Sequence, residues 1–460
     1  MTTEPNAKAV GSRPSSLPGW LVAAGIALIA VAGMIFVRGG AIHPESYHTY
    51  LPHYLGDAPF LQKIFDVNVT DAGNYQAREL SYVFDWIDCH FIDFCVGLGA
   101  PHFLSLTYYV FSALLSVAIW RFGVHDLGLD RWIVALLLAL YWTAPQVVLS
   151  GFCYRSAKVG TMLMICLFVW LCHRQLAAPT QAMTSGQRVR TWILAYLLLV
   201  LGTLFDRQGF YLEAVAAGIL FFWFCAYRGT MALGLAVAAA AAFVTSHLYN
   251  VWLCPMIIYE LLGYDPDFTF QGTSLAASEL LNPVVIKGAY GLLVDNARYF
   301  LGNVSGFVLQ LGVVAVAVTL FLAARRHAVY EARRPRLAPW LALVIFFGVL
   351  GAIFLMNEFM VMKFSPVLWD DLRRVYYWSP TVGLFLFGAT LIIGWIGRAG
   401  LLKVRLTRML LLAMLLNNIA VLPEHYRYYA GGQLSGWIAS KPALLRALRH
   451  LDDPSKGAPK

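Results

Sequence analysis

The chain has 460 residues, of which 59% are hydrophobic and only 13% are charged, and its mean hydropathy is +0.65. Soluble domains carry about 25% charged residues, so this composition excludes a soluble enzyme, a nucleic-acid-binding domain and a disordered scaffold. The sequence therefore predicts an all-α membrane protein, a polytopic helical bundle that forms one domain over residues 1–460.

Eleven apolar runs predict membrane-spanning helices, because each approaches or reaches the roughly 20 residues needed to cross a bilayer. The first run follows Lys8 and Arg13 but lacks a small-residue cleavage site, so it predicts a retained helix rather than a signal peptide. The predicted spans cover residues 20–37, 103–120, 132–150, 159–172, 191–205, 209–227, 230–247, 300–324, 338–356, 380–397 and 406–421.

The net charge of +9 is distributed unevenly between the two sides of this topology. If the N-terminus is cytoplasmic, the cytoplasmic segments hold 17 of the 34 Lys and Arg residues in about 74 positions, and few carboxylates. Lys and Arg accumulate in cytoplasmic loops, so this orientation is predicted. It leaves a short outer C-terminal tail, residues 422–460, and long acidic outer loops, where a site is expected.

The first outer loop, residues 38–102, carries two stripes at helical spacing. They predict an amphipathic helix from Asp71 onward, lying on the outer membrane surface with its carboxylates at the level of the lipid head groups. The apolar stripe consists of Leu80, Phe84, Ile87 and Phe91, and the polar stripe of Asp71, Tyr75, Arg78, Tyr82 and Asp85.

Cations gather at the predicted outer ends of the other spans. Guanidinium groups bind phosphate with two parallel hydrogen bonds, lysine adds point charge, and a carboxylate can take a proton from a hydroxyl. Aromatic rings can cover a sugar or a lipid tail. These residue types together predict a phosphate-linked lipid substrate and a hydroxyl acceptor. The cations are Arg155, Lys158, Arg207, Arg373 and Arg374, with Tyr376, Tyr377 and Trp378 beside the last two.

The topology, the long acidic first outer loop and the segment Asp71-Ala-Gly-Asn-Tyr-Gln-Ala-Arg-Glu-Leu-Ser resemble polytopic glycosyltransferases of the C superfamily (GT-C). The resemblance implies transfer of a sugar from a polyprenyl-phosphate carrier to a hydroxyl of a glycan, glycolipid or protein, with inversion, at the outer face of a bacterial inner membrane. Asp71 best matches the catalytic carboxylate, with Glu79 and Asp85 as alternatives. The implied substrate-binding residues are Tyr75, Arg78, Arg155, Lys158, Asp206, Arg207, Glu213, Arg373, Arg374, Tyr376 and Tyr377.

The sequence departs from that superfamily in two places. The second outer loop, residues 151–158, has no acidic residue, and no large outer domain follows the last span. Two other functions therefore stay open: a lipid or sugar transporter or flippase, and an O-antigen polymerase or ligase. No cofactor is predicted, and a divalent metal would require converging carboxylates.

Each candidate residue also has a structural interpretation. Asp71 can cap a helix, and Glu79 can pair with a neighbouring cation. Asp85, Asp88 and Asp93 can form a solvated face, and Arg155 and Lys158 can anchor the chain at the interface. Asp206 and Arg207 can form a hairpin tip, while Arg373 and Arg374 can neutralise Asp370 and Asp371. Glu213 lies seven residues after Asp206, which predicts that both face one side of the same helix, and a carboxylate within a span is expected to serve a site or a polar network.

Overall fold

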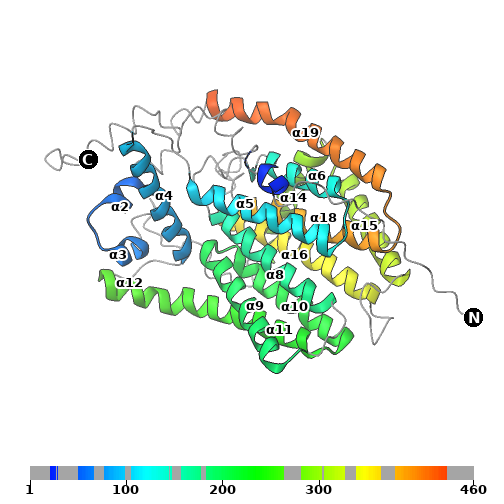
Figure 1. Ribbon diagram of the computed structural model, residues 1–460, viewed down its shortest axis with the longest axis horizontal. Coiled ribbons are helices and arrows are strands. Elements are labelled where there is room, and N and C mark those ends of the chain that lie inside the picture. Colours follow the sequence, from blue (N-terminus) through cyan, green and yellow to red (C-terminus); the bar gives the residue numbers. More distant parts are fainter. Residues whose placement is uncertain are drawn as a thin grey trace, which may run out of the picture.

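The computed structural model describes residues 21–26, 28, 50–66, 77–98, 105–144, 146–147, 157–177, 183–263, 281–302, 305–326, 338–363 and 379–431. Within these ranges the chain forms fifteen α-helices and two π-helical segments and contains no β-strand (Figure 1). The predicted all-α class is confirmed.

Nine helical segments in the described ranges are long and apolar enough to cross a membrane, which confirms the predicted polytopic membrane protein. They are α5 (Leu106–Trp120) with η3 (Arg121–Asp126), α8 (Ala157–Ala177), α9 (Ser185–Phe205), α10 (Gly209–Tyr227), α11 (Thr230–Leu248) with its extension, α15 (Gly306–Arg326), α16 (Ala338–Lys363), α18 (Ser379–Arg398) and α19 (Val404–Gly431).

Two of the eleven predicted spans differ from this set. The run 132–150 forms only a 13-residue helix, α6 (Arg131–Thr143), because Ala144 turns to an extended conformation. Residue 145 is a proline, and the residue before a proline is disfavoured in the helical region. The run 20–37 lies mostly outside the described residues.

Small residues let the helices of the bundle approach closely. Gly234 of α11 lies against the indole of Trp192 on α9, and Gly160 of α8 lies against the ring of Phe205. Membrane helices associate through such close contacts because lipid tails give no hydrophobic driving force between helices. The tight contacts hold α8, α9, α10 and α11 as one packed group.

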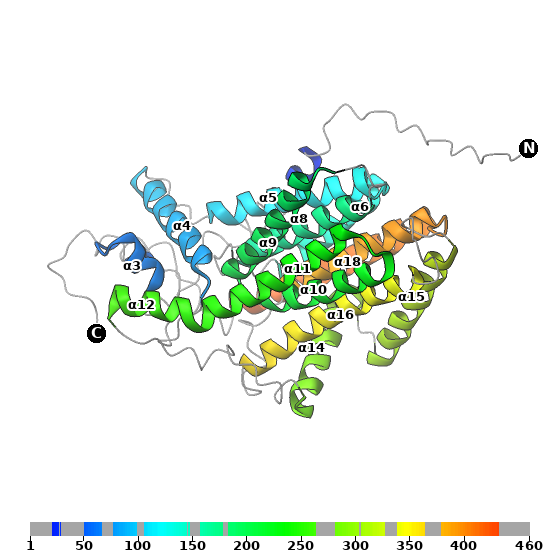
Figure 2. The same ribbon diagram turned by 90° about the horizontal axis from the view of Figure 1, so that it is seen from below.

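Four helices form a separate lobe at one end of the bundle: α2 (Leu51–Leu55), α3 (Phe60–Phe65), α4 (Glu79–Gly97) and α12 (Cys254–Leu262). They share a buried core that includes Tyr54, Tyr82, Cys89, Ile92 and Ile258. Figures 1 and 2 both show the lobe projecting from the bundle on the left. We call this end of the molecule the lobe end.

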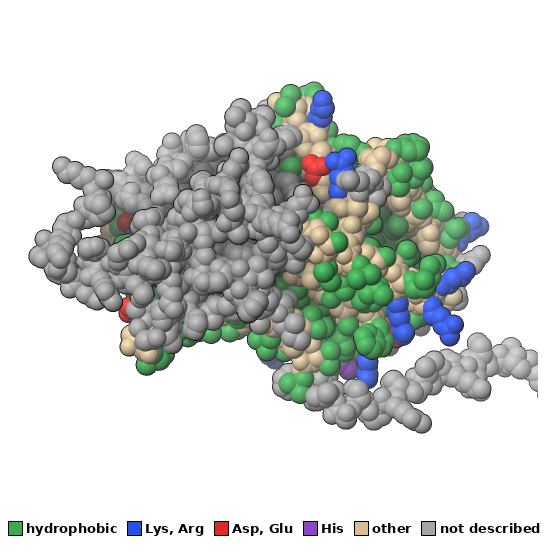
Figure 3. Space-filling view, turned by 90° about the horizontal axis from the view of Figure 1, so that it is seen from above, with side chains coloured by type: hydrophobic (Ala, Val, Ile, Leu, Met, Phe, Trp, Pro, Cys, Tyr) green, Lys and Arg blue, Asp and Glu red, His purple; other side chains and the backbone are tan. Residues whose placement is uncertain are grey.

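The opposite end of the bundle is rich in cations, and we call it the basic end. Figure 3 shows Lys and Arg side chains gathered on the side of the molecule away from the lobe. Arg174 near the end of α8 and Arg398 at the end of α18 both contact Asp126 at this end. Arg408 of α19 forms a two-pronged ion pair with Asp130, the N-cap of α6, at 2.9 and 2.6 Å.

One helical segment runs without interruption from the bundle into the lobe. It joins α11, the π-helical segment η4 (Tyr249–Leu253) and α12 into 33 residues, Thr230–Leu262. At 1.5 Å per residue it is about 50 Å long, whereas the hydrocarbon core of a bilayer is about 30 Å thick. We call this segment the arm. The lobe therefore packs on the part of the arm that exceeds the length of a span.

The described members of the predicted polar stripe are covered by protein, while the predicted position of the helix at the membrane surface stays a prediction. Arg78, Tyr82 and Asp85 are all buried. The apolar stripe also packs against protein, since the ring of Phe84 contacts those of Phe111 and Phe205. In the first half of α4 the lobe core lies on one side and the bundle on the other, whereas His90, Asp93 and Phe94 in its second half are exposed. A further helix, α14 (Pro283–Leu301), packs against α16 and α19.

Candidate functional site

Three cations meet at the lobe end, where the start of α4, the start of α8 and the link from α9 to α10 lie close together. Arg78 directly precedes α4, Lys158 is the second residue of α8, and Arg207 lies in the short link between α9 and α10. We call these three residues the cation cluster. The structure thus brings two of the predicted phosphate-binding residues, Lys158 and Arg207, together with Arg78, which was predicted as a substrate-binding residue and lies 129 positions before Arg207 in the sequence.

A buried ion pair joins Lys158 to Asp206, the residue that ends α9. Lys158 Nζ donates to one carboxylate oxygen of Asp206, and the backbone N–H of Gln208 donates to the other at 3.0 Å. Burial alone would raise the pKa of Asp206, but the charges of Lys158 and Arg78 and these hydrogen bonds outweigh it and hold the pKa below its usual value. Asp206 is therefore ionised and fixes the α8 and α9 ends together.

Arg78 is buried against the aromatic ring of Tyr82. Its Nε donates to the Tyr82 hydroxyl at 3.2 Å, and the guanidinium carbon lies 5.3 Å from the ring centroid. Burial raises the pKa of the Tyr82 phenol, although the Arg78 charge acts in the opposite direction. Tyr82 therefore stays a neutral hydroxyl that orients Arg78 toward the α9–α10 link, where its charge acts on Asp206.

Arg207 is the cation of the cluster with unused hydrogen-bonding capacity. Burial lowers the pKa of its guanidinium to about 10, which leaves it charged at neutral pH. Its Nη1 atom is buried and has no hydrogen-bond partner among the described residues. A buried cation without a full set of partners is costly, so an anion bound here would compensate it.

Glu79 lies beside the cation cluster and contacts the arm. The thiol of Cys254 donates to Glu79 Oε1 at 3.2 Å, and the hydroxyl of Tyr249 also hydrogen-bonds to this carboxylate. Glu79 interacts electrostatically with Tyr82, and Arg207 interacts in the same way with Cys254. The described site therefore sets three cations beside Asp206 and Glu79, with the charge of Asp85 acting on Tyr82 and that of Glu358 acting on Tyr211.

Of the three carboxylates expected to form a solvated face, Asp93 is exposed, whereas Asp85 and Asp88 are buried, so the expectation is wrong for those two. Asp85 faces the lobe core, where its charge raises the pKa values of Tyr54 and Cys89, after the larger effect of burial. Asp88 accepts hydrogen bonds from Ser105 Oγ at 2.5 Å and from Thr107 Oγ1 at 2.7 Å and N at 2.9 Å. Asp88 thus anchors α4 to the first turn of α5.

Replacing Asp88 with asparagine is expected to remove a pH dependence of stability. Burial raises the pKa of Asp88 from 3.8 to about 6, against the opposing effect of its hydrogen bonds. The folded state therefore binds the proton more tightly than the unfolded state. The associated stability, roughly 2–3 kcal/mol, is present below about pH 4 and lost as the pH rises to about 6.

Thermal unfolding at pH 4.5 and pH 7 measures this effect in wild type and in Asp88→Asn. The asparagine can still accept from the Thr107 N–H, so the variant should fold and show a smaller difference between the two pH values. An equal difference in both proteins would show that Asp88 does not contribute.

Glu213 lies within a span but belongs to a different network. Its Oε1 accepts from Thr203 Oγ1 at 2.7 Å and from Ser246 Oγ at 2.9 Å, which links α9, α10 and α11. The prediction that Asp206 and Glu213 face the same side of one helix is wrong. Asp206 is extended and precedes α10, which begins at Gly209, so helical spacing does not relate the two residues.

Several predicted site residues lie outside the described residues, and their roles stay predictions. They are Asp71, Tyr75, Arg155, Arg373, Arg374, Tyr376 and Tyr377. Sequence reasoning missed Gln208, Tyr249 and Cys254, which support Asp206 and Glu79. Gln208 acts through its backbone N–H, and the contacts of Tyr249 and Cys254 arise only when the arm meets α4, so the residue types give no signal of these roles.

The part of the chain that the structure describes contains no group of three or more His, Cys, Asp or Glu side chains placed to hold a metal ion. Comparison of the chain with protein-family models, with curated proteins and with solved structures finds no match. The site is therefore interpreted from its own geometry and charge.

Proposed function

We propose that the protein is a membrane glycosyltransferase that takes a sugar from a polyprenyl-phosphate carrier and transfers it to a hydroxyl group of a cell-envelope glycan, glycolipid or protein. The observation that carries the proposal is the cation cluster, three cations that meet where membrane-spanning helices end, one of them with a buried N–H that has no partner among the described residues. Such a position suits a ligand whose anionic group lies at the membrane surface and whose chain lies in the bilayer. A carrier phosphate has this chemistry.

The proposed reaction forms one bond and breaks another at the anomeric carbon. The acceptor oxygen attacks this carbon, its proton passes to a carboxylate, and the bond to the phosphate oxygen breaks with its electron pair on the phosphate. Asp71 remains the first candidate for the carboxylate. Glu79 is the candidate within the described residues that lies beside the cations, whereas Asp85 faces the lobe core.

Charge gives the cation cluster a role in the transition state. The phosphodiester of the donor carries one negative charge, and the departing phosphate monoester gains a second, because its second pKa is about 6. Cations placed beside the leaving phosphate therefore bind the developing phosphate more tightly than the intact donor. Interactions that strengthen in the transition state are those that accelerate a reaction.

The proposal places the lobe end at the outer face of a bacterial inner membrane. Lys and Arg concentrate at the basic end, and cytoplasmic segments carry such a bias. The cation cluster would then meet a carrier lipid in the outer leaflet, and the acceptor would approach from the lobe end.

Arg207→Gln is expected to weaken the binding of polyprenyl phosphate by about 10- to 100-fold, the effect of losing a hydrogen bond to a charged group. Arg298→Gln is the matched control, because Arg298 is exposed and pairs with Asp295 on its own helix. Tryptophan fluorescence titration of the purified proteins measures the binding. Equal affinity in wild type and Arg207→Gln would contradict the proposed phosphate site.

Sugar transfer is measured with a panel of polyprenyl-phosphate sugars and acceptors, using wild type, Asp71→Asn and Glu79→Gln. Folded but inactive Asp71→Asn would assign the base to Asp71, and inactive Glu79→Gln with active Asp71→Asn would assign it to Glu79. Movement of the carrier across vesicles without any transfer would instead support a flippase.

A further inference from the structure

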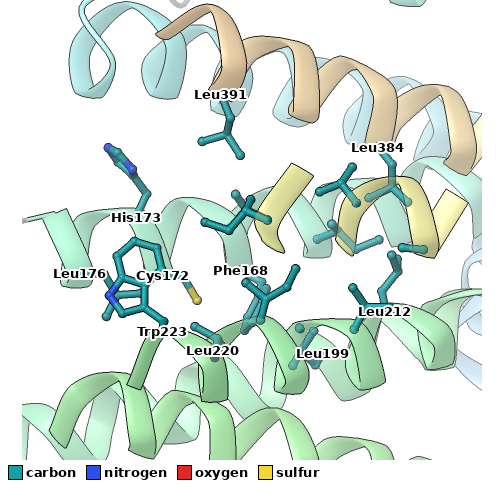
Figure 4. Close-up of a pocket in the computed structure, with 18 of the residues that line it drawn as sticks. Phe168, Cys172, His173, Leu176, Leu199, Leu212, Leu220, Trp223, Leu384 and Leu391 are labelled. Carbon is teal, nitrogen blue, oxygen red and sulfur yellow. The ribbon is translucent and has the colours of Figure 1, made fainter. Parts of the chain in front are cut away.

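A second candidate site lies inside the bundle, away from the cation cluster. A cavity of about 150 Å³ separates α8, α10, α16 and α18. Figure 4 shows His173, Leu176 and Trp223 at one end of it and Leu212 and Leu384 at the other. Apart from His173 and the indole nitrogens, its lining is hydrocarbon and sulfur. An apolar cavity of this size stays dry and accepts an apolar guest.

The cavity runs toward the basic end. His173 and Leu176 lie in the last turns of α8, and Trp395 lies in the last turn of α18. Because α8 supplies lining residues from Ile165 to Leu176, the cavity extends about 16 Å along the bundle at 1.5 Å per residue. A slot of this length and direction suits a chain that enters from the leaflet at the basic end.

Two guanidinium groups lie close to this end of the cavity. Arg174 follows His173, and its side chain is 64% exposed, with one carboxylate oxygen of Asp126 3.9 Å away. Arg398 donates to the backbone oxygen of Asp126 at 2.7 Å, and its charge acts on His173. The Asp126 carboxylate also accepts from Trp170 Nε1, so it is shared. The end of the cavity therefore carries excess positive charge.

Trp395 adds a buried donor to this arrangement. The residue lines the cavity and is buried, and its Nε1 atom has no hydrogen-bond acceptor in the described ranges. Leaving such a donor unsatisfied is unfavourable, and a dry apolar cavity supplies no water to satisfy it. A carbonyl oxygen of a bound molecule would satisfy it once a rotation of the indole turns this atom toward the cavity.

We propose that this cavity binds an acyl chain of an anionic phospholipid from the leaflet at the basic end. The chain fills the apolar slot, an ester carbonyl accepts from Trp395 Nε1, and the phosphate lies between Arg174 and Arg398. The head-group end of the site is at the opposite end of the bundle from the cation cluster. It is thus a structural lipid site that does not depend on the proposed transferase function.

The test is a titration of the purified full-length protein in a phospholipid-free detergent with dioleoyl phosphatidylglycerol, followed by native mass spectrometry. Ala216→Phe fills the cavity from α10, and Ala214→Phe is its control, because Ala214 is exposed on the same helix. We expect at least a tenfold weaker affinity in Ala216→Phe and no change in Ala214→Phe. Dioleoyl phosphatidylcholine should bind wild type at least tenfold more weakly than phosphatidylglycerol.

A second pair of variants keeps the proposal testable if Ala216→Phe does not fold. Trp395→Phe removes the donor, and Trp192→Phe removes an indole N–H that is also buried and unsatisfied among the described residues but lies outside the cavity lining. We expect a several-fold loss of phosphatidylglycerol affinity only in Trp395→Phe. Unchanged affinity in both cavity variants, or equal binding of the two phospholipids, would overturn the proposal. Displacement of phosphatidylglycerol by polyprenyl phosphate would also overturn it, because the cavity would then belong to the carrier.

Discussion

Replacing Asp206 with leucine is expected to destabilise the folded protein by about 3–5 kcal/mol, because it leaves the Lys158 ammonium buried without its counter-charge. Lys158 is 3% exposed, so water cannot replace the lost carboxylate. The backbone N–H of Gln208 loses its acceptor as well. Thermal and denaturant unfolding in detergent measures the loss.

The double variant Lys158→Met/Asp206→Leu separates the value of the pair from the cost of a single buried charge. Replacing both members of a buried ion pair by apolar groups is often neutral or stabilising, so this variant should recover most of the lost stability. It should still fail to bind polyprenyl phosphate as tightly as wild type, since one cation is gone. A double variant as unstable as Asp206→Leu would show that the Gln208 contact, and not the ion pair, dominates.

Gly160→Ala is expected to destabilise the protein by about 1–3 kcal/mol, the range for overpacking a well-packed core. A methyl group here would lie 2.5 Å from the ring of Phe205. That ring cannot move easily, because it is stacked on Phe84 at 5.2 Å and meets Phe111 edge-on at 5.2 Å. Phe205 directly precedes Asp206, so the variant should also weaken phosphate binding.

Gly218→Ala is the matched control for this prediction. Gly218 lies on α10, is exposed, and has no atom within 4 Å of an added methyl group. Alanine is favoured over glycine within a helix by roughly 0.5–1 kcal/mol, so this variant should be slightly more stable than wild type. An equal change in unfolding free energy in the two variants would show that the Phe205 ring moves to accommodate the added methyl group. Unfolding of both proteins under the same conditions decides between these outcomes.

Hydropathy predicted most of the transmembrane helices because span length and apolar composition are fixed by the bilayer itself. Nine of the eleven predicted runs correspond to the nine candidate spans. The predicted span 132–150 is wrong because it treats the residues on both sides of Pro145 as one helix, whereas the helix ends at Thr143. The arm was predicted only to residue 247, whereas the helix continues to Leu262 through residues 248–258, which are also mostly apolar.

The candidate site was less predictable than the spans. Periodicity identified the polar stripe of α4, but it does not show whether water or protein covers a stripe, so the burial of Arg78 and Asp85 was missed. Lys158 and Asp206 were each proposed, yet nothing in the sequence pairs residues 48 positions apart. Asp206 was related to Glu213 by helical spacing, and this failed because the chain is extended at Asp206.

The uninterrupted arm sets the geometry between the lobe and the bundle. An α-helix cannot lengthen without breaking backbone hydrogen bonds, so the number of residues between Thr230 and Cys254 fixes both the height and the rotation of the lobe. One inserted residue would raise α12 by about 1.5 Å and turn it by about 100°, carrying Cys254 away from Glu79. Seven inserted residues would restore its facing direction but lift it by roughly 10 Å. The length of the arm therefore sets both the distance and the rotation of α12 relative to the bundle. The contact between Cys254 and Glu79, and with it the position of Glu79 beside the cations, depends on that length.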